Sequence, residues 1–272
     1  MSVTVQHKPG PGLFCPSGHW THLASFDAPP PGETDFGIPD YHRSLWQSDD
    51  TGHIVNLHAM DLESLYDSGY WDRTYPDGIL PVFERIMGLP PDRSDNRQRV
   101  ARIEAFWRAS GGSAPRTVLD VGSGLAVFPA AMQGAGWSCT ALDPDPRATR
   151  HAEDAAGVDV LTGDFMSVAA DRQYGLVTLN KVLEHVEDMV GMLDRARAFL
   201  VPGGWVYVEV PDGEAAIAAG PEREEFFVEH YAAFSMASLA LLCHRAGYRT
   251  DLIERVIEPS GKYTLRAFLC QP

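Results

Sequence analysis

The stretch from residue 117 to residue 126 constrains the fold of this chain more than any other. Its first half is rich in valine and leucine, as expected for a short strand buried on both faces of a parallel sheet. Gly122 and Gly124 follow, and because they lack a Cβ the backbone there can turn sharply and approach a ligand. A helix predicted over residues 125–136 would point its unbonded N–H groups at that ligand. The stretch therefore predicts a strand, a glycine turn and a helix at a ligand site.

From residue 116 onward, predicted strands and helices alternate along the chain. This alternation is typical of an α/β fold in which helices cover both faces of a mostly parallel sheet. Ligands of such sheets bind at the carboxyl ends of the strands. We therefore predict a Rossmann-like, seven-stranded sheet in a domain that spans residues 114–272. The predicted strands are 118–121, 140–142, 158–161, 175–179, 205–210, 249–256 and 263–269, and the predicted helices are 125–136, 146–156, 188–200 and 235–246.

The first 113 residues follow a different pattern. Residues 1–60 contain many prolines and glycines, which disfavour long helices, so we expect an irregular or β-rich N-terminal flap. Residues 61–113 have a helical pattern, and we expect a helical lid or linker there. Tyr70 lies in this part of the chain, where it could serve hydrophobic packing.

Two segments of the flap have the outline of a zinc knuckle, in which two C-x-x-C-G pairs supply four thiolates. Of the four ligand positions in these segments, the first is a cysteine, Cys15, and the other three are occupied by Gly18, Ser48 and Thr51. The histidines nearby have spacings that fit no standard zinc pattern. A bound metal is therefore disfavoured, and we expect a degenerate knuckle in a small β-rich flap. The histidines considered are His19, His22, His42 and His53.

The formal net charge is −15, from 22 basic and 37 acidic residues, and no lysine or arginine cluster stands out. This balance disfavours electrostatic binding to nucleic acid or to an anionic membrane. The four cysteines are scattered, so no disulfide framework is implied. No apolar run is long enough to span a bilayer, and the N-terminus lacks the layout of a signal peptide. We therefore expect a cytoplasmic protein, whose oligomeric state the sequence leaves open.

Polar residues stand at the ends of the first four predicted strands, namely Asp120, Asp143, Asp164 and Asn180. A carboxylate after the second strand suits the hydroxyls of a ribose. The dinucleotide fingerprint G-x-G-x-x-G requires a third glycine, but Val127 stands at that position. Asp120 also places negative charge where a pyrophosphate would lie, which better suits an ammonium group. The site therefore favours a nucleoside joined to a cationic amino acid over a dinucleotide.

Residues 118–124 resemble the first motif of class I S-adenosylmethionine-dependent methyltransferases. Later motifs of that family are also matched in the expected order, and the resemblance covers about residues 115–270. Ala126 departs from the family, which often has glycine there. The later matching segments are Asp143-Pro144, Gly163-Asp164-Phe165, residues 180–186 and residues 200–204.

The resemblance implies that S-adenosylmethionine binds along the predicted crevice. Gly122, Ser123 and Gly124 would pass beneath its methionine part. Asp120 would reach its amino group through water, and Asn180 would line the methionine end.

The same resemblance assigns the nucleoside part of the cofactor. Asp143, followed by Pro144, would hold the ribose, and Tyr70 would close over the cofactor. Asp164 would bond the adenine amine, with Phe165 beside the ring. An alternative stays open for Asp143 and Asp164, namely that each only stabilises a local turn.

Base candidates for the reaction occur in two stretches, Glu184-His185 and residues 224–231. In the second, Glu229-His230 resembles the acid–base pair of sugar C-methyltransferases, which also carry an N-terminal zinc knuckle. Phe227 departs from that subgroup, which tends to have tyrosine there. The resemblance makes Glu229 and His230 the first choice for base and proton relay, with His185 as a further catalytic candidate. A purely structural role for either histidine stays open.

The leading hypothesis is methyl transfer from S-adenosylmethionine to the oxygen or carbon of a small molecule, such as a sugar or a natural-product intermediate. The first alternative is a protein that binds the cofactor without catalysing a reaction. A nicotinamide-dependent oxidoreductase is a further alternative, which Val127 disfavours.

Overall fold

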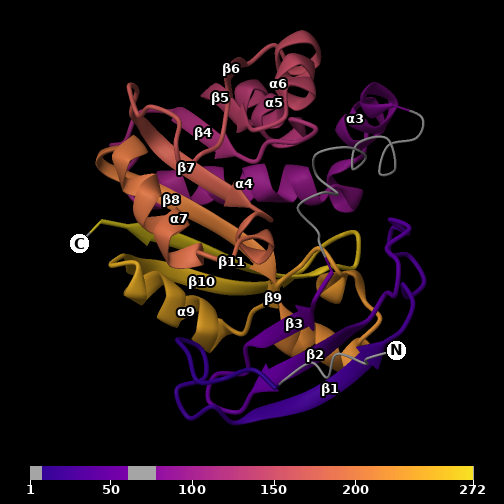
Figure 1. The fold of residues 1–272 in the computed structure, drawn as a ribbon. Coiled ribbons are helices and arrows are strands. Elements are labelled where there is room, and N and C mark those ends of the chain that lie inside the picture. Colours follow the sequence, from indigo (N-terminus) through magenta and orange to yellow (C-terminus); the bar gives the residue numbers. More distant parts are fainter. Residues whose placement is uncertain (1–7, 61–77, 272) are drawn as a thin grey trace.

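The structure is a computed structural model, and it describes residues 8–60 and 78–271. Its larger sheet has seven strands in the order β10-β11-β8-β7-β4-β5-β6 (Figure 1). Five of these strands, β4 to β8, are joined by parallel pairing. β11 runs antiparallel to both β8 and β10, so β10 points the same way as those five. This sheet confirms the predicted fold class. Its strands are β4 (Thr117–Val121), β5 (Ser138–Asp143), β6 (Asp159–Thr162), β7 (Tyr174–Asn180), β8 (Leu200–Pro211), β10 (Arg249–Ile257) and β11 (Tyr263–Cys270).

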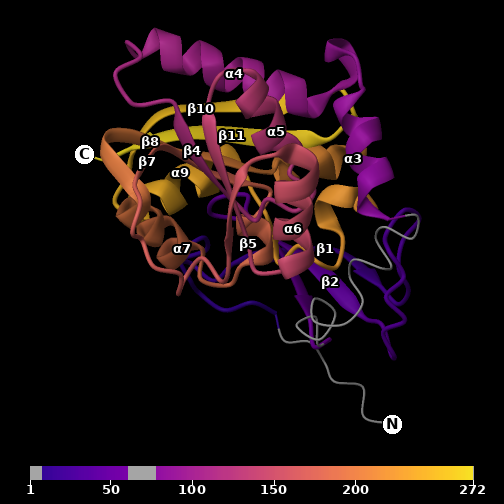
Figure 2. The same ribbon diagram turned by 90° about the horizontal axis from the view of Figure 1, so that it is seen from above.

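Helices cover both faces of the sheet, with α4 on one side and α7 and α9 on the other (Figure 2). Neighbouring strand residues therefore belong to different cores. Leu176 packs into the core that includes residues of α4 and α5, whereas Val177 packs into the core that includes residues of α7 and α9. The helices are α3 (Ile79–Met87), α4 (Asp95–Ala109), α5 (Val127–Gly134), α6 (Pro146–His151), α7 (Met189–Ala196), α8 (Gly213–Ala216) and α9 (Met236–Arg245).

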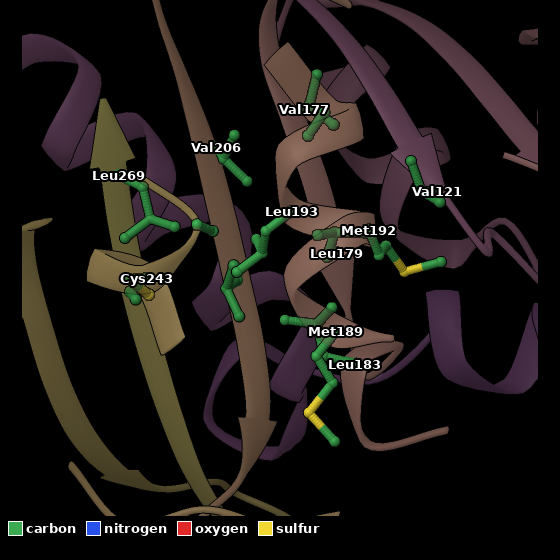
Figure 3. Packing of buried hydrophobic residues seen from close by; sticks show 14 of the residues in the cluster. Val121, Val177, Leu179, Leu183, Met189, Met192, Leu193, Val206, Cys243 and Leu269 are labelled. Atoms are coloured by element: carbon green, nitrogen blue, oxygen red, sulfur yellow. The ribbon is translucent and has the colours of Figure 1, made fainter. Parts of the chain in front are cut away.

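The core on the α7 side fixes the strand that ends at the predicted crevice. Met192 and Leu193 of α7 lie beside Val177 and Leu179 of β7 (Figure 3). Burying each large apolar side chain contributes about 1.5–3 kcal/mol relative to leaving it exposed. The valine- and leucine-rich composition of β7 therefore matches a strand covered on both faces and holds its carboxyl end in place.

Helix α4 packs directly on the larger sheet. Ser94 begins it as an N-cap, since its side chain accepts a hydrogen bond from the backbone N–H of Arg97. Phe106 stacks on Phe268 of β11 with ring centroids 3.9 Å apart. The proposed division into a flap, a lid and a core domain stays a prediction, although this packing associates α4 with the core.

Residues of the N-terminal flap form a second, antiparallel sheet in the order β1-β2-β3-β9. Its strands are β1 (Trp20–Phe26), β2 (Arg43–Ser48), β3 (Ile54–His58) and β9 (Ala232–Ala233), so the last strand comes from the other end of the chain. The prediction of irregular structure is wrong for β1 to β3, and the β-rich alternative is confirmed. The prolines of this region lie outside the three strands, which explains why they do not interrupt the sheet.

Hydrogen bonds connect the two knuckle-like segments. The hydroxyls of Ser48 and Thr51 donate to the backbone carbonyl of Phe14, at 2.7 and 2.6 Å. The Cys15 thiol donates to the carbonyl of His19 at 3.0 Å. Hydroxyl contacts thus join segments that thiolates and zinc would join in a knuckle. The loss of a metal from this region stays a prediction.

No helix in the described part of the chain is both long and apolar enough to cross a lipid bilayer.

Candidate active site

A cavity of about 790 Å³ opens at the carboxyl ends of β4, β5 and β7. This is the edge of the sheet at which ligands of such folds bind. Its volume suits a ligand of cofactor size. The lining residues are Val121, Gly122, Gly124, Leu142, Asp143, Pro144, Asp145, Pro146, Arg147, Asp164, Phe165, Lys181, Val182, His185, Val186 and Met192.

The glycine turn after β4 forms one wall of this cavity. Gly122 and Gly124 have φ angles of 67° and 49°, in the region that favours glycine. A Cβ added to Gly122 would lie 3.0 Å from Cγ2 of Val182, so a side chain there would require Val182 to shift. Ala126 also has a positive φ, 55°, which explains why glycine is common at this position in the resembled family.

Asp120 is buried and bound by neutral donors. Its Oδ1 accepts hydrogen bonds from Thr178 Oγ1 at 2.6 Å and from Asn180 Nδ2 at 2.7 Å. Burial raises the pKa of Asp120 to about 7, and these two donors oppose the rise. Oδ1 of Asn180 is buried and has no hydrogen-bond partner among the described residues. Asp120, Ser123 and Asn180 are not among the lining residues of the cavity.

Asp143, by contrast, is held at the cavity wall by backbone amides. Its two oxygens accept hydrogen bonds from the N–H groups of Gly124 and Asp145, both at 2.9 Å. Burial raises its pKa, and the two backbone hydrogen bonds work against this shift. The bond to Gly124 ties the end of β5 to the glycine turn. Pro144 follows on the same wall.

Asp164 and Phe165 also line the cavity. Asp164 caps a local turn, since its Oδ1 accepts from the N–H of Met166 at 3.0 Å. Phe165 is largely buried and stacks on Phe199 with ring centroids 5.2 Å apart. Both residues therefore combine a structural role with a place on the wall. Tyr70 lies outside the described residues, so its role over the cofactor stays a prediction.

The structure brings His185 and His230 together, with ring centroids 4.8 Å apart. Nδ1 of His185 lies 2.8 Å from the backbone carbonyl of Glu229, and Nδ1 of His230 lies 3.0 Å from that of Glu225. A carbonyl can only accept, so each Nδ1 carries a proton and each Nε2 is the basic nitrogen. Burial lowers the pKa of His185 to about 4 and that of His230 well below its usual value. Both rings are therefore neutral at pH 7.

Two carboxylates accompany these histidines. Oε2 of Glu229 is buried without a hydrogen-bond partner among the described residues, and burial raises the pKa of Glu229. Glu184 is fully buried, and neither of its carboxylate oxygens has such a partner. Burial raises the pKa of Glu184 to about 7, which the charge of Lys181 opposes. Sequence reasoning pointed to the stretch that contains Glu184 but selected only His185, because no motif indicates that Glu184 turns inward.

The N-terminal sheet holds the loop that carries Glu229 and His230. Arg43 of β2 is fully buried, donates to the backbone carbonyl of Phe226 at 2.7 Å and pairs with Glu33 at 3.2 Å. Glu33 in turn accepts from the backbone N–H of Val228 at 2.8 Å. Asn56 of β3 donates to the carbonyl of Phe226 as well, at 3.3 Å. Sequence reasoning did not find Arg43, Glu33 or Asn56, since a single sequence gives no signal for contacts this far apart along the chain.

The sheet order, the glycine turn and the carboxylate at the end of β5 define a nucleoside-binding α/β domain. A family model described as "Methyltransferase domain" matches residues 93–252, which is more than half of the chain. The chain therefore belongs to the methyltransferase-domain family. This assignment confirms the class predicted from the sequence, a class I methyltransferase, and leaves the sugar C-methyltransferase subgroup unconfirmed.

Two curated relatives are ubiquinone biosynthesis O-methyltransferases. The enzyme of Nitrosomonas europaea is 31% identical over 113 residues, which are 39% of this chain and 48% of the relative. The enzyme of Psychrobacter cryohalolentis is 26% identical over 170 residues, 58% of this chain and 65% of the relative. The chain thus spans about half to two thirds of the length of these relatives.

Two solved structures share the fold. The magnesium protoporphyrin IX methyltransferase of Synechocystis, solved with S-adenosylhomocysteine, has a TM-score of 0.59 at 15% identity and covers 77% of this chain and 100% of its own. The 1,6-didemethyltoxoflavin-N1-methyltransferase of Burkholderia thailandensis, also solved with S-adenosylhomocysteine, has a TM-score of 0.57 at 19% identity and covers 84% of this chain and 94% of its own.

Proposed function

We propose that the protein transfers the methyl group of S-adenosylmethionine to a hydroxyl oxygen of a small molecule. The observation that carries this proposal is the pair of neutral imidazoles, His185 and His230, beside the cavity. A neutral imidazole can remove a hydroxyl proton near pH 7. The curated relatives named as O-methyltransferases support the same reaction, although the chain matches only part of their length.

The residues of the cavity fit the cofactor. The carboxylate of Asp143 lies at the wall where a ribose would bind, and its oxygens have capacity for further donors. Asn180 does not line the cavity, but it directly precedes Lys181 on its wall, and its unpartnered Oδ1, together with the carboxylate of Asp120, suits the cofactor's ammonium group. A Cβ added to Gly124 would meet nothing within 4 Å, so this glycine of the turn leaves space on the cavity wall. When bound, S-adenosylmethionine supplies an electrophilic methyl group on a sulfonium.

The remaining chemistry is proton removal and positioning. His185 lies on the cavity wall, and the ring of His230 packs edge-on against the ring of His185. We therefore assign to this pair the removal of the proton from the acceptor. The backbone carbonyls of Glu229 and Glu225 hold the two rings in one tautomer. The side chain of Glu229 favours a second candidate reaction. Its buried, unpartnered carboxylate would suit C-methylation next to a ketone, where a carbon acid must lose its proton.

The test measures cofactor binding and turnover separately. We expect S-adenosylmethionine to bind in calorimetry, and mass spectrometry to find a +14 Da product with phenols or sugar hydroxyls. His185→Gln and His230→Gln should each lower kcat by about 10²–10⁴-fold, with the cofactor Kd nearly unchanged. His244→Gln, at an exposed position on α9, is the matched control.

Other outcomes would change the proposal. Methyl transfer only to the carbon of a ketosugar, with loss of activity in Glu229→Gln, would favour the C-methylation reaction. Tight cofactor binding with no product across hydroxyl and keto acceptors would favour a protein that binds the cofactor without catalysis.

A further inference from the structure

We propose that Glu184, His185 and His230 form a binding site for a divalent first-row transition metal such as Zn²⁺ or Mn²⁺. One ligand atom from each of the three residues lies within 4.8 Å of the other two. In the part of the chain that the structure describes, no other group of three or more such residues comes this close. Two histidines and one carboxylate are a donor set that binds these metals and leaves coordination positions open.

The burial of Glu184 is the first independent argument for a cation. Its carboxylate is fully buried, and both of its oxygens lack a hydrogen-bond partner among the described residues. A buried charge without a partner is costly, and buried carboxylates are normally paired or bound to a metal. The nearby ammonium of Lys181 opposes the rise in the pKa of Glu184 through its charge, but neither carboxylate oxygen accepts a hydrogen bond from it. A divalent cation would satisfy the carboxylate.

The orientation of the two imidazoles is the second argument. Each ring uses Nδ1 to donate to a backbone carbonyl, from Glu229 for His185 and from Glu225 for His230. Metal-binding histidines typically donate their other ring N–H to a carbonyl or carboxylate in this way, which fixes the tautomer and increases the basicity of the coordinating nitrogen. The Nε2 atoms are therefore the coordinating atoms.

The donor chemistry selects the class of metal. Mg²⁺ and Ca²⁺ prefer sites built from oxygen ligands, whereas imidazole nitrogens suit Zn²⁺ and Fe²⁺, and the single carboxylate also suits Mn²⁺. One carboxylate and two neutral imidazoles leave a bound divalent ion with a net charge of +1. His185 also lines the cavity, so open coordination positions could take an acceptor oxygen. An imidazole whose Nε2 binds the ion cannot also accept a proton, so in the metal-bound protein the ion would replace the histidine base by lowering the pKa of the acceptor hydroxyl. This catalytic role rests on the proposed function.

Metal binding itself is tested without cofactor or acceptor, so its failure is separate from failure of methyl transfer. The full chain is stripped with a chelator and titrated with Zn²⁺, Mn²⁺ or Mg²⁺, with stoichiometry from elemental analysis. We expect one equivalent of Zn²⁺ and much weaker binding of Mg²⁺. Glu184→Gln and His230→Gln should each weaken Zn²⁺ binding on the order of 100-fold, about 2.7 kcal/mol. Circular dichroism checks that both variants fold.

The controls separate this site from the knuckle-like segments. Glu229→Gln alters a neighbouring carboxylate outside the donor group, and Cys15→Ser removes the remaining knuckle thiol. Both should keep the Kd for Zn²⁺ within about twofold, and Co²⁺-loaded protein should show absorption of a nitrogen- and oxygen-bound ion without a thiolate band. Absence of stoichiometric binding in the unmodified chain would overturn the proposal, as would binding that only Cys15→Ser abolishes.

Discussion

The two halves of the crevice differ in whether their buried carboxylates have hydrogen-bond partners. On the side proposed to bind the cofactor, Asp120 and Asp143 each accept two hydrogen bonds from side-chain or backbone groups of the larger sheet and its loops. On the side proposed to bind the acceptor, Glu184 and Glu229 have buried oxygens without hydrogen-bond partners among the described residues. The carboxylates on the side proposed for the cofactor are therefore satisfied by the larger sheet and its loops, whereas those on the side proposed for the acceptor retain oxygens that an acceptor, a proton or an ion can bind.

The two halves also differ in what positions them. The acceptor loop reaches the N-terminal sheet through Arg43 and Glu33, which lie 183 and 195 residues from their partners in that loop. Tyr231 then links both regions, since its N–H donates to the carbonyl of Glu184 and its carbonyl accepts from Asn56. The N-terminal sheet is thus part of the acceptor half, and changes in it should affect that half selectively.

The largest expected effect comes from removing Arg43. Arg43→Met leaves Glu33 buried without its cation, which should lower the free energy of unfolding by about 3–5 kcal/mol. Urea denaturation measures this change. At temperatures where the variant stays folded, calorimetry should give a nearly unchanged Kd for S-adenosylmethionine, together with a reduced kcat.

The matched control is Arg172→Met, which breaks an ion pair to Asp159 at a half-exposed position. It should cost less than about 1 kcal/mol. A cofactor Kd that rises in Arg43→Met as much as kcat falls would contradict the separation of the two halves.

A smaller effect concerns the charge of Asp120. Its pKa is raised to about 7 in the folded chain, above the value of an unfolded aspartate, so folding favours its protonated form. The stability from this group is therefore complete below about pH 4 and is lost as pH rises through about 7. Asp120→Asn should be more stable than the parent chain at pH 8, by at most about 4 kcal/mol, and the difference should vanish toward pH 4. Urea denaturation across this range would contradict the assignment if the difference stayed constant.

Sequence reasoning predicted the strands and the glycine turn at the cavity wall but missed the inward position of Glu184 and the contacts of Arg43, and the reason is physical. A buried parallel strand requires a run of valine and leucine, and the turn after it requires glycine, so both leave a local trace in the sequence. The position of Asp143 follows from the same pattern, because it ends the next strand. The burial of the Glu184 side chain and the contacts of Arg43 with the loop that carries His230 depend on segments far apart in the chain. Contacts of this kind leave no local pattern in the sequence.

The last prediction tests the cofactor half alone. Asp143→Ala removes a carboxylate that accepts from Gly124 and stands on the cavity wall, so both the ribose contact and the tie to the glycine turn are lost. Hydrogen bonds to charged groups contribute about 1.5–3 kcal/mol, so calorimetry should find S-adenosylmethionine binding weakened by roughly 10–100-fold. Asp159→Ala, at an exposed position on β6, is the control and should leave binding unchanged. Zn²⁺ binding at Glu184 should also persist in Asp143→Ala, because that site lies in the other half. An unchanged cofactor Kd in Asp143→Ala would contradict the ribose assignment, and loss of both ligands would show that the halves are not independent.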